Sequence, residues 1–119
     1  MKLVTFKEKD GKLQLGALIH DDRGVLNLQT AFKQENGKIS PYFYSMFSII
    51  EGGKKALELA ENLIVQSSGE AIYKFDDITL KTPIPQPPQI RDCLCFEEHL
   101  IKAFDVLRRV KAEAQDDPD

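Results

Sequence analysis

The first thirty residues show the alternation of apolar and polar side chains that is typical of half-buried strands. A short apolar segment at 3–6 is followed by Asp10-Gly11, a dipeptide that favours a tight turn. The alternating apolar residues of the next segment are Leu13, Leu15, Ala17 and Ile19. A polar turn at 20–24 then leads to a third apolar segment at 25–28. The pattern predicts a three-stranded antiparallel meander.

Ser40-Pro41 is a pair that is typical of an N-cap followed by proline at the first helical position, so a helix is expected to begin there or a few residues later. Apolar residues then recur every three or four positions as far as Ile64, with an interruption at Gly52-Gly53. This predicts two short helices, joined by the glycine pair and packed on the meander. A last extended segment is expected over 72–83. The fold class is therefore α+β, a small antiparallel sheet with packed helices.

Four prolines within 83–88 exclude a helix or a central strand there and predict a stiff extended connector. Beyond the connector, apolar residues again have helical spacing. They are Phe96, Leu100, Ala103, Phe104, Leu107, Val110 and Ala114. The sequence predicts a strongly amphipathic helix here, and an apolar stripe this wide must be buried against another surface.

Composition narrows the function class. The net charge of −3 and the interruption of each basic cluster by acidic residues give no nucleic-acid footprint, so no nucleic-acid partner is expected. The apolar runs are far shorter than a bilayer span, so no membrane partner is expected either. Charged residues follow the first apolar segment at once, which is unlike a signal peptide. The lack of a signal-peptide pattern and the presence of only two cysteines together predict a cytoplasmic protein.

Candidate chemistry is concentrated in the segment 90–100. Cys93, Cys95 and His99 form a C-x-C-x3-H set that could in principle hold zinc, although a fourth ligand is not evident and buried thiols are commoner. Asp92 by itself would be read as an acid at a helix N-terminus. His99 alone would be read as a surface histidine, and His20 in its polar turn as a solvated loop residue.

Asp92 precedes His99 by seven residues, directly after the proline connector. Further short motifs occur in a matching order along the chain. They are Met1 to Phe6, Gly16-Ala17, Ile50 to Gly53, and Leu80 to Pro85. Taken together, the chain resembles the N-terminal region of the fumarylacetoacetate hydrolase family. The resemblance implies an N-terminal α+β domain over 1–82, a connector over 83–89 and, over 90–119, the opening segment of a truncated, β-rich catalytic domain.

The resemblance also implies an activity, metal-assisted cleavage of a carbon–carbon bond in diketo or oxo acids. His99 would be the general base that activates water, a task suited to a group whose pKa lies near neutrality. Asp92 would be the first ligand of a divalent metal, Mg²⁺, Mn²⁺ or Ca²⁺, in the parent enzyme. The family further implies a homodimer.

Departures from the family pattern limit these expectations. Cys93 and Leu94 stand where some members carry an aromatic pair that includes a substrate-contacting tyrosine, and Lys102 stands where others carry a glutamate that orients the histidine. Glu97 and Glu98 are the possible substitutes for that glutamate.

The family's other acidic metal ligands are missing from the chain. We therefore expect a fragment that is inactive alone, with no metal bound by this chain itself. The alternative is a stand-alone noncatalytic module whose apolar stripe mediates dimerisation or partner binding.

Overall fold

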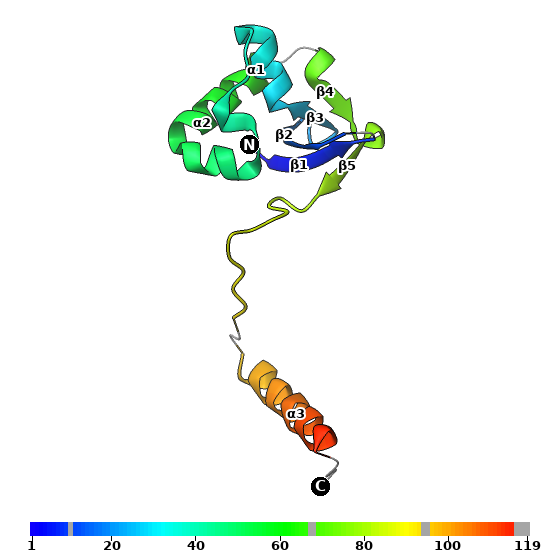
Figure 1. The fold of residues 1–119 in the computed structure, drawn as a ribbon. Coiled ribbons are helices and arrows are strands. Elements are labelled where there is room, and N and C mark those ends of the chain that lie inside the picture. The colour runs from blue at the N-terminus through cyan, green and yellow to red at the C-terminus, as the bar shows by residue number, and fades with distance from the viewer. Residues whose placement is uncertain (10, 67–68, 94–95, 116–119) are drawn as a thin grey trace. The chain divides into compact units, whose positions relative to one another are not determined.

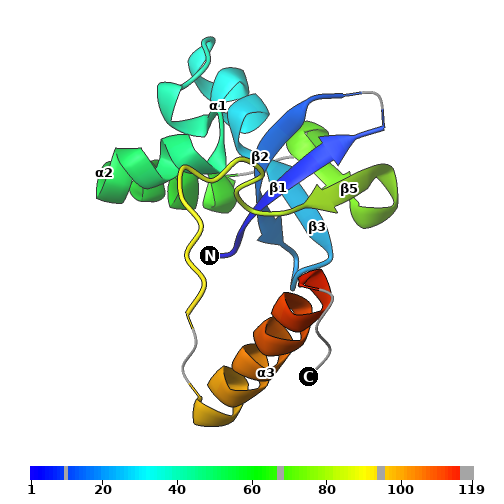
Figure 2. The ribbon, with the colours of Figure 1, turned by 60° about the horizontal axis from the view of Figure 1, so that its bottom comes forward.

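The computed structural model of the 119-residue chain describes residues 1–9, 11–66, 69–93 and 96–115. Two compact units are present, Met1–Gln86 and Pro87–Asp119. The first unit is an α+β domain and the second contains one helix, as the ribbons of Figure 1 and Figure 2 show. The predicted α+β class is confirmed.

A five-stranded antiparallel sheet forms the centre of the first unit. Its strands are β1 (Leu3–Glu8), β2 (Leu13–Ile19), β3 (Gly24–Asn27), β4 (Ile72–Lys74) and β5 (Ile78–Lys81). They lie in the order β4-β3-β2-β1-β5. The predicted meander is confirmed as β1 to β3. The extended segment expected over 72–83 is two strands, which pair with the two free edges of that meander.

Strand register places two different sets of side chains on the two faces of the sheet. Leu15 of β2 pairs with Thr5, whereas Phe6 pairs with Gln14, one position along. Because side chains alternate across a strand, Leu15 and Phe6 therefore lie on opposite faces. Both are almost completely buried, so each face of the sheet supports a core of its own.

Helix α1 (Leu28–Asn36) follows β3 without a loop. The expectation that the third strand continues to Leu28 was wrong, because Asn27 ends the strand and caps the helix. Its side-chain oxygen accepts a hydrogen bond from the backbone N–H of Thr30 at 3.1 Å, the usual N-cap arrangement. Leu28 then packs into the core as the first helical residue.

Ser40 and Pro41 begin a 3₁₀ turn, Pro41–Phe43, and the Ser40 hydroxyl accepts from the N–H of Tyr42 at 3.2 Å. Helix α2 (Met46–Gln66) follows. Gly53 interrupts it with φ 60° and ψ −143°, so two helical segments meet at a kink. The prediction of two helices joined at the glycine pair is confirmed.

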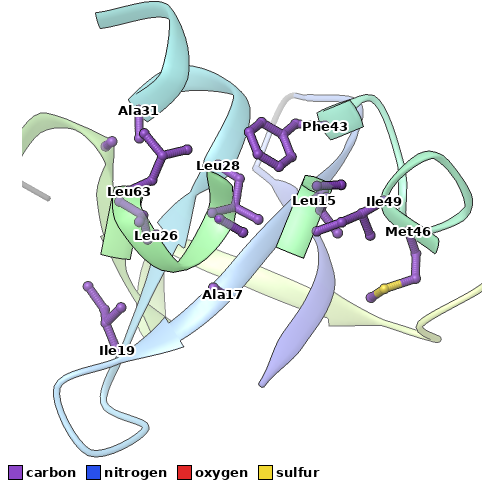
Figure 3. Close-up of a cluster of buried hydrophobic side chains, with 13 residues drawn as sticks. Leu15, Ala17, Ile19, Leu26, Leu28, Ala31, Phe43, Met46, Ile49 and Leu63 are labelled. Carbon is purple, nitrogen blue, oxygen red and sulfur yellow. The ribbon is translucent and has the colours of Figure 1, made fainter. Parts of the chain in front are cut away.

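The main core lies between the sheet and these helices, as Figure 3 shows. Leu15 and Leu26 from the sheet meet Phe43, Ile49 and Leu63 from the helical layer. A smaller cluster on the other face contains Phe6, Val25 and Ile78, described below as the second-face cluster.

No helix or strand forms over 82–93, as the prolines predict. Helix α3 (Glu97–Ala114) follows and confirms the predicted amphipathic helix. Two shorter turns, Gly69–Ala71 and Phe75–Asp77, complete the elements of the first unit. Among the helices of the described residues, none has both the length and the apolar character needed to cross a membrane.

Candidate functional site

His99 lies in the first turn of α3 and is exposed. It borders an open depression together with Phe96, Glu98 and Lys102. Within the described part of the chain, no hydrogen bond or ion pair engages its imidazole. The ring is therefore accessible to solvent and to a small molecule, as a general base must be.

Asp92 lies in the extended segment before α3 and is also exposed. Asp92 precedes the helix, so it is not the acid at the N-terminus of α3. That place is taken by Glu97 and Glu98, whose charges favour the positive end of the helix dipole. Among the described residues, no hydrogen bond or ion pair joins Asp92 to His99.

The two glutamates considered as orienting groups are near His99 in sequence but do not hold its ring here. Glu98 instead forms an ion pair with Lys102, with Nζ and Oε1 2.8 Å apart. This is the i,i+4 spacing that stabilises exposed helices. Lys102 therefore binds the carboxylate that was expected to assist the histidine.

The described residues contain no group of three or more His, Cys, Asp or Glu side chains arranged to hold a metal ion. Cys93 is a free, exposed thiol. Cys95 and Leu94 lie outside the described residues, so the C-x-C-x3-H set is described only in part. Asp92 and His99 alone give too few ligands for a divalent metal, and no metal-assisted step is assigned to the described residues alone.

A cavity of about 250 Å³ in the first unit was not predicted from the sequence. It lies between β1, β2, the start of α2 and the chain at 84–86. Its lining residues are Thr5, Leu13, Gln14, Tyr44, Ser45, Met46, Phe47, Ile84, Pro85 and Gln86. They come from four separate segments, and no local motif joins them, which is why sequence patterns did not reveal them.

Tyr44 is the titratable residue among those that line the cavity. None of the described residues that line it is a histidine, cysteine or carboxylate. The Thr5 hydroxyl donates to the carbonyl oxygen of Pro83 at 2.6 Å, and the Ser45 hydroxyl is 3.0 Å from that of Ser48. These hydroxyls hold the start of the connector and the start of α2, so their contacts here are structural.

A polar cluster adjoins the second-face cluster. The Gln14 amide donates to a Glu8 carboxylate oxygen at 3.3 Å, and the Asn27 amide donates to Gln14. A hydrogen bond with Glu8, burial and the negative charge of that carboxylate together raise the pKa of Tyr73 to about 12, against a smaller opposing effect of Asn27. The raised pKa keeps the Tyr73 phenol protonated to a higher pH than that of an ordinary tyrosine.

In comparisons with known proteins, no family model matches the chain and no curated protein matches it.

Proposed function

We propose that this chain is the N-terminal part of a metal-dependent hydrolase of the fumarylacetoacetate hydrolase type, acting on a carbon–carbon bond of a diketo or oxo acid. The observation that carries the proposal is the accessible imidazole of His99 in the first turn of α3, seven residues after Asp92. An α+β unit and a proline-rich connector precede this pair, the order that the family resemblance implies.

In this proposal His99 removes a proton from water, and the resulting hydroxide attacks the carbonyl carbon beside the bond to be broken. The adduct then collapses to a carboxylic acid as the carbon–carbon bond breaks, and the enolate that leaves takes the proton held by His99. A divalent metal, when bound, would polarise the substrate oxygens and stabilise the developing enolate. Asp92 would contribute one carboxylate oxygen to it. The remaining ligands would come from acidic residues outside this chain, so the 119 residues alone are proposed to be inactive.

The test is an activity assay on the complete product of the encoding reading frame, with Mg²⁺ or Mn²⁺ and short diketo acids as substrates. His99→Ala should lower turnover by at least about 10²-fold, the usual effect of losing a general base. His20→Ala is the matched control, because His20 is the chain's only other histidine and lies exposed in the turn between β2 and β3. Turnover of His99→Ala near the parent value would remove His99 from the mechanism.

Metal binding is tested separately by isothermal titration of Mg²⁺ and Mn²⁺ into the 119-residue chain and its Asp92→Ala variant. Weak binding that is equal in both supports an incomplete ligand set. Tight binding that Asp92→Ala abolishes would show that the chain, or its oligomer, completes a metal site, and the proposal of ligands from outside would then be wrong.

A further inference from the structure

The structure buries none of the residues of α3. The apolar side chains of α3, together with that of its N-cap residue Phe96, follow a heptad spacing of four, three, four, three and four residues. The residues at these positions are Phe96, Leu100, Ala103, Leu107, Val110 and Ala114. Such a seam is the contact surface of paired helices. In proteins most helical stability comes from the packing of an apolar face, so the seam needs an apolar surface to cover it.

The sizes of the seam residues distinguish two ways of pairing α3 with a second copy. In a parallel pair each residue would face itself, so phenylalanine would meet phenylalanine in one layer and alanine would meet alanine in others. In an antiparallel pair every layer joins a larger residue to a smaller one. The antiparallel layers, each formed twice, are Phe96 with Ala114, Leu100 with Val110, and Ala103 with Leu107. Layers of nearly constant volume fill the interface without voids.

The charges that flank the seam also favour the antiparallel pair. The antiparallel pair brings Glu97 beside the partner's Lys111, which is a pair of opposite charges, and it also places the polar side chain of His99 beside that of the partner's Glu113. Both contacts form twice by symmetry. In a parallel pair the flanking contacts would instead join His99 to Phe104 and Val106 to Lys111, with no pairing of opposite charges. Only the antiparallel arrangement is complementary in charge.

The middle of the antiparallel seam is extended by two more exposed side chains. Phe104 would meet the partner's Phe104 on one side of the central layers, and Val106 would meet the partner's Val106 on the other. Phe104 is 55% exposed and Val106 is 58% exposed in the structure. Pairing would therefore remove from water the apolar residues that α3 exposes within its own unit.

We propose that α3 is a self-association surface, on which two copies of this chain pair through their α3 helices in antiparallel orientation. This inference goes beyond the proposed hydrolase function and does not depend on it.

Sedimentation equilibrium of the 119-residue chain tests the surface first. The chain should dimerise, and Leu107→Gln should raise the dissociation constant by at least about a hundredfold, because a central apolar contact is lost twice. Ile101→Gln is the matched control, since Ile101 is exposed on α3 but lies off the seam. A monomer at several hundred micromolar, or equal effects of the two variants, would overturn the proposal.

A charge exchange tests the orientation. At low salt, Glu97→Lys should weaken dimerisation by about fivefold or more, because two attractions become two repulsions. Adding Lys111→Glu in the same chain should restore it. Glu98→Lys, which also removes a first-turn acid but lies off the seam, should leave the dissociation constant within about twofold of the parent value. If the double variant does not recover, the antiparallel arrangement is wrong. Circular dichroism of each variant checks that α3 still forms.

Discussion

The rings of Phe6 and Tyr73 lie with their centroids 5.7 Å apart and their planes inclined at 47°. Phe6 is in β1 and Tyr73 is in β4, and the sheet order places β2 and β3 between them. In a flat sheet the two strands would be about 14 Å apart, three spacings of about 4.8 Å. The sheet is therefore strongly curled, and the second-face cluster is enclosed by the curvature of the strands themselves.

This curl depends on Gly16 at the centre of the sheet. A Cβ at this position would lie 2.5 Å from Cγ1 of Val25 and 2.9 Å from Cε1 of Phe6. Both neighbours are fully buried and have no room to move away. Gly16→Ala should therefore lower the free energy of unfolding by about 1–3 kcal/mol, the usual cost of overpacking, as measured by urea denaturation.

The control for this prediction is Gly69→Ala. A Cβ at Gly69 would meet no atom within 4 Å. Its replacement should change the free energy of unfolding by less than about 0.5 kcal/mol. Equal effects at both positions would show that the close approach at Gly16 does not limit stability.

Asn27 joins the end of β3 to the start of α1. It is fully buried, accepts from the Thr30 N–H and donates to Gln14. Asn27→Ala leaves these buried groups without their partner and should cost about 1–3 kcal/mol of stability. Asn36→Ala is the comparison, because the side chain of Asn36, in the last turn of α1, donates an exposed hydrogen bond to the Phe32 carbonyl. A cost at Asn27 no larger than that at Asn36 would contradict the capping role.

Two glycines with positive φ should respond differently to asparagine. Gly37, at the end of α1, has φ 72° and ψ 1°, a left-handed conformation that asparagine often adopts. Gly53 has φ 60° and ψ −143°, a region that is almost restricted to glycine. Gly53→Asn should therefore cost about 1–3 kcal/mol, and Gly37→Asn less than about 1 kcal/mol. Thermal unfolding of the two variants measures the difference, and equal costs would show that the kink in α2 relaxes.

Patterns among neighbouring residues correctly predicted several helices and strands. The strand alternation around Leu15, the Ser40-Pro41 cap and the glycine pair of α2 each depend on neighbouring residues, and each is confirmed. Helix α1 was missed because its cap, Asn27, also ends a strand, and the apolar Leu28 fits either pattern. The pairing of β4 and β5 with the two edges of the meander depends on contacts far apart in the sequence, which periodicity does not record.

For the candidate site, the sequence predicted only the types of the residues and their spacing along the chain. His99 and Asp92 are accessible, as their proposed roles require, but the Glu98–Lys102 ion pair follows from helix geometry that the resemblance did not include. The cavity beside Thr5 was missed for a similar reason, since it forms only where the connector meets the sheet.

The contact between Tyr73 and Glu8 predicts a dependence of stability on alkaline pH. Folding raises the pKa of Tyr73 from about 10 to about 12, so the native state favours the protonated phenol. The stabilisation is fully present below pH 10 and is lost as the pH rises towards 12. Because solvent screens part of the interaction, we expect a loss of about 1 kcal/mol.

The measurement is the difference in unfolding free energy between the parent chain and Tyr73→Phe, which should be constant up to about pH 9.5 and fall above it. With Glu8→Gln in both chains, the fall should be much smaller, because the main cause of the raised pKa is gone. An equal fall in both backgrounds would show that Glu8 does not control the tyrosine.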